Sequence, residues 1–157
     1  QMLHKYRFVR SKTGNIGLAI ILPQKYSLST QLPIITQEKI LKPGRFAAIK
    51  DGKVIGWCAL NPVSKREVYK GVAESTIYIA ADHRGKGVGR RLLKHLIISS
   101  KNAGFWTLQA SIFSENKSSI YLHQQCGYRV VGIRERIGKR NGQWYNNILM
   151  EHRNDIT

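Results

Sequence analysis

The segment at residues 77–93 restricts the possible folds more than any other part of this chain, because three patterns follow one another within it. Residues 77–79 alternate isoleucines with a tyrosine, which is typical of a strand that packs one face on a core. A basic, glycine-rich stretch at 84–89 comes next. Val88 and Leu92 then begin an apolar stripe with the spacing of an α-helix. The sequence therefore predicts a strand, a glycine loop and a helix in direct succession.

The glycine loop predicts a binding site for an anion, most often a phosphate group. Gly85, Gly87 and Gly89 have no side chain, so the backbone can bend sharply and a ligand can approach it closely. The first N–H groups of the following helix have no intrahelical partner and carry the positive end of the helix dipole. The pattern does not identify the compound that carries the phosphate.

The chain is strongly basic, with 26 lysines and arginines against 9 acidic residues in a length of 157 and a net charge of +17. Such a surface attracts nucleic acid, anionic membranes and phosphorylated small molecules. The excess is spread along the chain, however, without an arginine-rich tail or an aromatic and basic RNA-binding motif. No apolar run is long enough to cross a membrane. We therefore expect general surface basicity, and neither nucleic acid nor a membrane as a partner.

The two cysteines, Cys58 and Cys126, lie far apart and match no metal-binding or redox spacing. Both stand among apolar residues, so we expect reduced core cysteines, a usage that suits the cytoplasm. We predict no bound metal, and neither cysteine is a candidate nucleophile.

The order of the remaining patterns predicts one mixed domain. The expected strands are 3–9, a hairpin of 45–50 and 53–60 around Asp51-Gly52, 72–81, 105–110, and a hairpin of 128–137 and 144–151 around Asn141-Gly142. The expected helices are a short one at 15–22, one turn at 37–42, and longer ones at 87–104 and 116–126. This order predicts an α/β (α+β) fold, a mixed and mostly antiparallel sheet of about six or seven strands flanked by about four helices. It contains too few βαβ units for a doubly wound sheet.

Two polar side chains in mainly apolar surroundings are candidates for chemistry. Glu74 is a carboxylate inside a strand of small or apolar residues, a few positions before the glycine loop. His123 shares one face of the helix at 116–126 with Asn116 and Ser119. Each alone is best explained as a structural residue, a solvent-facing acid and a hydrogen-bonded histidine. Because both flank the same loop, they are together candidates for the base and the acid of a group-transfer reaction.

Four segments of the chain resemble one protein family. Residues 84–89, Arg-Gly-Lys-Gly-Val-Gly, resemble the R/Q-x-x-G-x-G/A motif of the GNAT superfamily of N-acetyltransferases. Residues 73–79 and 116–128 resemble a strand and the N-x-x-S-x-x-L-H-x-x-x-G-[FY] segment of its phosphinothricin (methionine sulfoximine) acetyltransferase group. Residues 138–145 resemble that group's G-x-x-x-G-x-W-x-D ending, with Asn146 where the acid usually stands. The resemblance covers residues 45–151.

The resemblance implies a single N-acetyltransferase domain over residues 1–157, with an atypical part at 1–44 and an acetyl-CoA-binding and catalytic core at 45–151. It implies acetyl-CoA as the acetyl donor and no metal. The residues that it assigns to acetyl-CoA binding are Ile77, Tyr78, Ile79, Arg84, Gly85, Lys86, Gly87, Val88, Gly89, Asn116 and Ser119.

The resemblance also implies roles in catalysis. Glu74 corresponds to the general base that removes a proton from the substrate ammonium, and His123 to a second, assisting catalytic residue. Arg66 and Tyr69 correspond to substrate-binding residues suited to the carboxylate or phosphinate of an amino-acid analogue. An amine is nucleophilic only when neutral, so a base is required at neutral pH. We expect direct transfer to a primary amine in a ternary complex, without a covalent enzyme intermediate.

Three functions stay open at this point. The first is acetylation of a small amino-acid-like amine, such as phosphinothricin or methionine sulfoximine, by a cytoplasmic homodimer like its relatives. The second keeps the fold and accepts a polyamine, an aminoglycoside or a protein N-terminus; polyamines and aminoglycosides are cations that suit a protein of net charge +17 poorly. The third is a nucleic-acid-associated or purely ligand-binding protein on the same scaffold, for which the charge is the only support. The first ranks highest.

Overall fold

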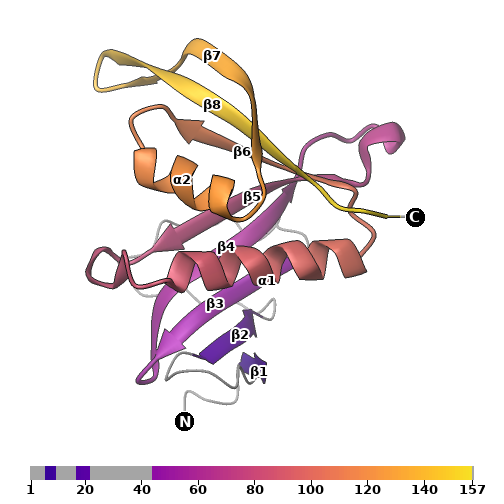
Figure 1. The fold of residues 1–157 in the computed structure, drawn as a ribbon, viewed down its shortest axis with the longest axis vertical. Helices are drawn as coiled ribbons and strands as arrows, with labels where there is room; N and C mark the ends of the chain where they lie inside the picture. The colour runs from indigo at the N-terminus through magenta and orange to yellow at the C-terminus, as the bar shows by residue number, and fades with distance from the viewer. Residues whose placement is uncertain (1–5, 10–16, 22–43, 157) are drawn as a thin grey trace.

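The structure, a computed structural model, describes residues 6–9, 17–21 and 44–156. They form one eight-stranded sheet in the order β1-β2-β3-β4-β5-β6-β8-β7 and two α-helices (Figure 1). The strands are β1 (Tyr6–Val9), β2 (Gly17–Ile21), β3 (Arg45–Lys50), β4 (Lys53–Pro62), β5 (Val72–Ile79), β6 (Thr107–Phe113), β7 (Arg129–Arg140) and β8 (Gln143–Arg153). The helices are α1 (Val88–Asn102) and α2 (Lys117–Gln125), and the short 3-10 turns are η4 (Glu67–Tyr69) and η5 (Ala81–His83).

The predicted fold class is confirmed, because the sheet is mixed and all neighbouring strands are antiparallel except β5 and β6. Both predicted hairpins form, and Asp51 and Asn141 in their turns have φ angles of 49° and 50°. The number of elements differs from the expectation. The sheet has eight strands rather than six or seven, and the described residues contain two α-helices rather than four.

The short helix predicted at 15–22 is wrong, because Gly17–Ile21 is the strand β2. This strand pairs antiparallel with β1 on one side and with β3 on the other. A short, continuous apolar run fits a buried strand as well as a helix, so only its neighbours in space distinguish the two. The helical turn predicted at 37–42 lies outside the described residues.

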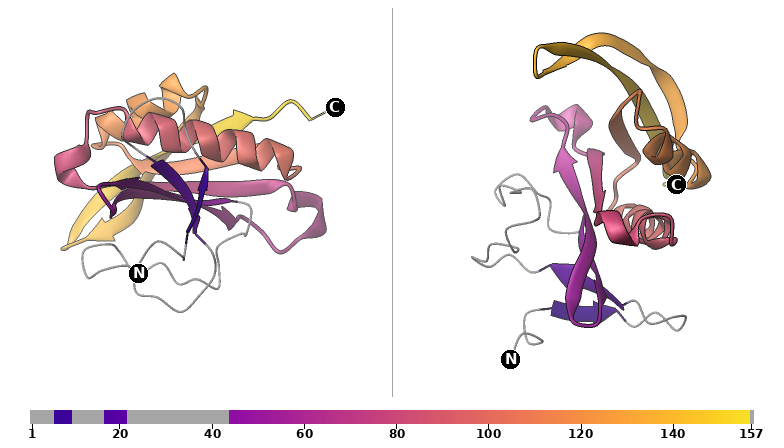
Figure 2. Two further views of the ribbon diagram at one scale, coloured as in Figure 1. Left: turned by 90° about the horizontal axis from the view of Figure 1, so that it is seen from below. Right: turned by 90° about the vertical axis from the view of Figure 1, so that its left-hand side faces the viewer.

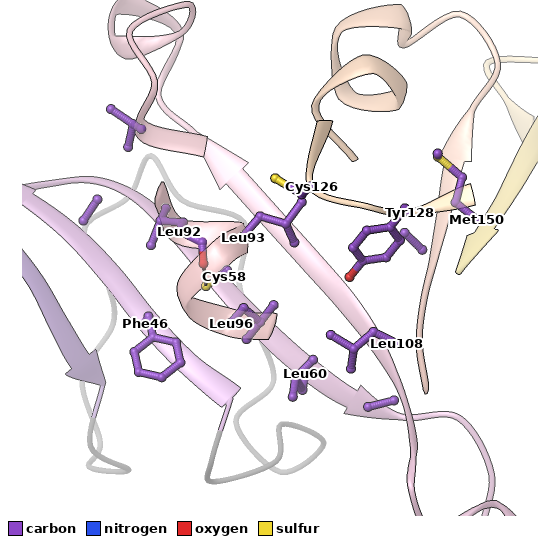
Figure 3. Close-up of a cluster of buried hydrophobic side chains, with 14 of the residues drawn as sticks. Phe46, Cys58, Leu60, Leu92, Leu93, Leu96, Leu108, Cys126, Tyr128 and Met150 are labelled. Carbon is purple, nitrogen blue, oxygen red and sulfur yellow. Dashed lines mark hydrogen bonds between the residues drawn. The ribbon is translucent and has the colours of Figure 1, made fainter. Parts of the chain in front are cut away.

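Helices α1 and α2 lie on the same face of the sheet (Figure 2). Leu92, Leu93 and Leu96 of α1 are fully buried there. They belong to one apolar cluster with Leu60 of β4 and Leu108 of β6 (Figure 3). Side chains alternate along a strand, so the residues that flank these core positions point to the opposite face of the sheet. In the described part of the chain no helix is long and apolar enough to cross a membrane.

The parallel pairing of β5 with β6 is short. It ends at the pair Glu74 and Gln109. Beyond that pair β5 continues along β4 to Ile79, whereas β6 continues along β8 to Phe113 (Figure 1). We call this separation, between residues 75–79 of β5 and 110–113 of β6, the β5–β6 fork. It leaves one edge of each strand without a ladder partner in the described sheet.

Candidate functional site

The glycine loop joins β5 to α1, as the sequence predicts. Gly85 and Gly87 have φ angles of 71° and 80°, a region in which other side chains are strained. A Cβ added at either position would meet nothing within 4 Å, so conformation rather than crowding favours glycine. Gly87 is the N-cap of α1, and no side chain among the described residues caps the helix. The loop therefore presents backbone donors at the positive end of a helix dipole.

Gly89 allows the start of α1 to lie close to α2 and β5. A Cβ there would lie 3.0 Å from Leu122 Cδ2 and 3.6 Å from Ile79 Cγ1. Val88 is buried in the core, so only its backbone can face a ligand. Arg84 Nε donates to the Ile79 carbonyl at 3.0 Å and thereby ties the loop to the end of β5.

Residues 77–79 lie along the β5–β6 fork. Ile77 and Ile79 pack against the core on the helical face. Tyr78 points to the other face, where its ring stacks on Trp57 with the ring centroids 6.3 Å apart. The side chains of this segment are thus occupied by packing, and the backbone edge at the fork is the part that remains for a ligand.

Glu74 lines an open pocket of about 280 Å³ beside the last pair of the β5–β6 ladder, just before the fork begins. The other lining residues are Asn61, Pro62 and Val63 from the end of β4 and beyond it, and Gln109 of β6. The Glu74 carboxylate is half-buried, and Gln109 Nε2 donates to its Oε2 at 3.0 Å. Glu74 forms no ion pair within the described residues. A carboxylate in this setting can attract an ammonium group and accept its proton.

His123 is buried on the helical side of the sheet, with 2% of its surface exposed. Its Nδ1 lies 2.7 Å from the Ser119 carbonyl, which can only accept, so we assign the proton to Nδ1 and leave Nε2 as an acceptor. Burial lowers the pKa of His123, and the hydrogen bond to Ser119 opposes this effect. The imidazole is therefore mainly neutral at pH 7.

The structure does not bring Glu74 and His123 together. Ser75, the residue after Glu74, points to the helical face, where its Oγ lies 2.9 Å from the Tyr128 hydroxyl. His123 packs edge-on against the Tyr128 ring with the centroids 4.9 Å apart. Because side chains alternate along β5, Glu74 points to the opposite face. The two candidates flank the same loop in sequence but lie on different faces of the sheet.

A chain of hydroxyl hydrogen bonds joins the strands at the base of the fork. Ser75 Oγ donates to the Gln109 carbonyl at 3.1 Å. A serine hydroxyl has one proton, so the Tyr128 hydroxyl donates to Ser75. Burial raises the pKa of Tyr128, which keeps its proton in place at neutral pH. The chain therefore connects β5, β6 and the segment after α2 where the two strands separate.

Asn116 and Ser119, two of the predicted cofactor-binding residues, organise the start of α2. The Asn116 side chain is the N-cap and accepts from the Ser119 N–H at 3.2 Å. Ser119 Oγ in turn lies 3.5 Å from His123 Nδ1. These contacts give both residues a structural role, and their contact with a ligand stays a prediction.

Arg66 and Tyr69, the predicted acceptor-binding residues, lie together in the loop after β4. Arg66 precedes η4, and its guanidinium carbon is 5.4 Å from the centre of the Tyr69 ring. Both residues are exposed. Neither lines the pocket of Glu74, although Val63 of the same loop does. Their role in binding an acceptor stays a prediction.

Asn146, which stands where the resembled motif has an acid, supports an irregular part of β7. Its Oδ1 accepts from the backbone N–H of Arg136 at 2.8 Å, and Arg136 has a φ of 50°. A carboxylate oxygen would accept the same hydrogen bond. The departure from the motif is therefore compatible with the local structure.

Sequence reasoning missed Gln109 and Asn61. Gln109 is a polar residue between Leu108 and Ala110, both of which are buried in the core, so alternation alone predicts a solvent-facing side chain. Only the register between β5 and β6 brings its amide to Glu74. Within the described ranges no group of three or more His, Cys, Asp or Glu could hold a metal ion.

The chain is similar to known acyltransferases in sequence. It is 30% identical over 102 residues to the L-amino acid N-acyltransferase MnaT of Escherichia coli (strain K12), covering 65% of this chain and 59% of that protein. It is 34% identical over 116 residues to the phosphinothricin N-acetyltransferase of Alcaligenes faecalis, covering 72% of this chain and 59% of that protein. The chain thus spans 59% of the length of both relatives.

The structure and the family model agree with these similarities. A phosphinothricin acetyltransferase of the GNAT superfamily from Sinorhizobium meliloti, solved in complex with AcCoA, aligns with a TM-score of 0.66 and 30% identity. The alignment covers 71% of this chain and 62% of that one. The model of the acetyltransferase (GNAT) family matches residues 18–128, which include the glycine loop, Glu74 and His123. The chain therefore belongs to the acetyltransferase (GNAT) family.

Proposed function

We propose that this protein is an acetyl-CoA-dependent N-acetyltransferase that moves an acetyl group directly to the primary amine of a small amino-acid-like substrate, of the phosphinothricin or methionine sulfoximine type. The observation that carries the proposal is the Glu74 carboxylate, half-buried in an open pocket and held by the Gln109 amide. The acyl- and acetyltransferases named above support it. We assign the activity to the core at 45–151 of a single domain over 1–157.

Acetyl-CoA fits the chemistry of the glycine loop and the fork. Nothing within 4 Å would contact a Cβ at Gly85 or Gly87, and the start of α1 is uncapped by any described side chain, so a pyrophosphate can approach these backbone N–H groups. When bound, the cofactor supplies an activated acetyl thioester. The residues proposed to hold it are Ile77, Tyr78, Ile79, Arg84, Gly85, Lys86, Gly87, Val88, Gly89, Asn116 and Ser119.

Glu74 is the proposed general base. A substrate amine is an ammonium at neutral pH and must lose a proton before its nitrogen can attack a carbonyl. The carboxylate attracts the ammonium and accepts that proton, directly or through a water molecule. Glu74 would hold that proton while the bond from the nitrogen to the acetyl carbon forms and the bond from that carbon to the CoA sulfur breaks. The departing thiolate would take up the second proton that the nitrogen loses, so that CoA leaves as the thiol.

His123 is proposed to assist without supplying a proton. Its Nδ1 proton is engaged by the Ser119 carbonyl, and burial lowers the pKa of the ring. The ring packs on Tyr128, whose hydroxyl donates to Ser75 at the base of the fork. In this proposal His123 supports the shape of the fork rather than the transfer of a proton.

Arg66 and Tyr69 are proposed to bind the acceptor. Arg66 can hold a carboxylate or phosphinate with two parallel hydrogen bonds, and Val63 of the same loop already lines the pocket. Among the described residues that line the pocket, Glu74 is the single acid. A polyamine or aminoglycoside, which carries several cations, therefore finds fewer partners there than an amino-acid analogue does.

The test is the release of CoA thiol with a panel of amines: phosphinothricin, methionine sulfoximine, spermidine, an aminoglycoside and a peptide N-terminus. We expect turnover with the first two. Glu74→Gln should lower kcat by about 100-fold or more, because the amide cannot accept a proton, while acetyl-CoA binding measured by calorimetry is retained.

Asp155→Asn makes the matching change of a carboxylate to an amide at an exposed position after β8 and serves as the control. Undiminished turnover of Glu74→Gln would exclude Glu74 as the base. If only spermidine or the aminoglycoside is acetylated, the acceptor is a polycationic amine and not an amino-acid analogue. Salt-sensitive RNA binding without acetyl-CoA binding would favour a nucleic-acid-associated protein instead.

We also propose that the enzyme is a cytoplasmic homodimer. Strand β7 is an edge of the described sheet, and its exposed apolar side chains are Val130, Val131, Ile133 and Ile137. An exposed, apolar edge strand favours pairing with another chain. Both cysteines are buried and free, which suits a reducing compartment.

A further inference from the structure

We infer that Gln109 is a positioning residue, which orients the Glu74 carboxylate toward the ammonium group of the acceptor. The inference rests on the proposed function, because it takes Glu74 to be the base. Gln109 acts in this inference through its hydrogen bond to Glu74 and not through contact with the reacting atoms.

The contact between the two side chains follows from the register of β5 and β6. Glu74 and Gln109 are partners in the last pair of the parallel ladder, so their side chains lie side by side on one face. Nε2 donates to Oε2 at 3.0 Å, and both residues line the pocket. The terminal torsion of a glutamate is otherwise broad. A bond to one oxygen restricts it and leaves Oε1 for the ammonium.

Gln109 is held from the other face of the sheet as well. Its carbonyl accepts from Ser75 Oγ at 3.1 Å, and Ser75 is bound in turn by the Tyr128 hydroxyl. One residue thus joins the base on the pocket face to the hydroxyl chain on the helical face. Through Gln109, the orientation of the Glu74 carboxylate therefore depends on the hydrogen bonds between β5 and β6 at the point where the two strands separate.

Gln109 lies between two carboxylates, and only one of them is paired with a cation. Glu151 of β8 is its register partner on the other side, and Arg129 Nε donates to Glu151 Oε1 at 3.0 Å. Glu74 has no such partner in the residues that the structure describes. A neutral amide orients Glu74 without cancelling its charge. A lysine or arginine in its place would pair with the base, and an apolar side chain would leave Oε2 unbound.

The contact can be tested without any substrate through the side-chain amide resonances. The Gln109 NH₂ pair in a ¹⁵N–¹H spectrum is identified by its loss in Gln109→Met. We expect Glu74→Gln to move this pair from its wild-type position, because the bonded carboxylate oxygen is replaced, and Asp155→Asn, the same change at an exposed position after β8, to leave it in place. A Gln109 pair that keeps its wild-type position in Glu74→Gln would overturn the inference.

The kinetic test uses Gln109→Met, which keeps the length of the side chain and removes the donor. We expect kcat to fall about 10- to 100-fold, with a much smaller change in KM for the amine, because a misoriented base slows the reaction more than it weakens binding. Acetyl-CoA binding and the melting temperature should stay near those of Gln124→Met, a matched change at an exposed position of α2. If Gln109→Met melts early, Gln109→Leu replaces it.

A double mutant separates positioning from a merely structural role. In the Glu74→Gln background, Gln109→Met should cause no further loss of kcat, because its effect passes through that carboxylate. An equal loss in both backgrounds would overturn the inference. The proposed function fails on different results, namely an unchanged rate in Glu74→Gln or the absence of turnover with every amine. In either case the amide resonances still show whether Gln109 contacts Glu74.

Discussion

At the scale of single residues, the buried imidazole of His123 makes the stability depend on pH. Burial lowers the pKa of His123 in the folded protein below the ordinary value of 6.5. Just below that pH the unfolded chain therefore binds a proton that the folded ring does not bind. The neutral ring contributes its full stability above pH 6.5, and this contribution is lost as the pH falls through and below that value.

We expect the urea midpoint of unfolding to fall between about pH 7 and pH 5, and to fall less steeply in His123→Gln, which cannot take up a proton. Burial also lowers the pKa of His95, so a part of the slope remains in the variant. Urea denaturation followed by circular dichroism at several pH values measures how the midpoint depends on pH in each protein. The same slope in both proteins would contradict this explanation.

At the scale of elements, α2 depends on its N-cap. The helix has nine residues, and helices of that length are marginal without capping and packing. The Asn116 side chain accepts from the Ser119 N–H, one of the donors that the helix itself cannot satisfy. Asn116→Ala should therefore lower the free energy of unfolding by about 1 kcal/mol.

Chemical denaturation measures this loss. Asn116→Asp keeps an oxygen acceptor and should cost less, and Lys117→Ala, at the neighbouring exposed position, is the control. Equal losses for alanine and aspartate at 116 would show that the cap contributes little.

At the scale of the whole molecule, the free edge of β7 is the feature that decides the oligomeric state in our proposal. Ile133 on this strand is 63% exposed, and Ile98 on α1 is 59% exposed. Ile133→Lys should convert the dimer into a monomer, because a buried interface would have to desolvate the new charge. Light scattering after gel filtration measures the mass. Ile98→Lys is the matched control, and a dimer that survives Ile133→Lys would exclude this edge as the interface.

The local sequence determined most of the elements of this protein. The glycine loop, both hairpins and both longer helices were predicted, because turn residues, glycine positions and apolar periodicity act over a few residues. The fold class and the family followed from these same segments. The apolar run at Gly17–Ile21 predicts a helix but forms a strand, since its conformation depends on pairing with β1 and β3 and not on its own pattern.

The tertiary structure decided how the candidate residues meet. The alternation along β5 separates Glu74 from His123, and the register of β5 with β6 brings Gln109 to Glu74 instead. Register is set between segments that lie far apart in the chain, and a shift of one residue would turn every side chain to the other face. The sequence by itself thus determined the glycine loop between β5 and α1, and it predicts that an acid belongs to the same site. Only the packed sheet determined that the partner of the acid is an amide.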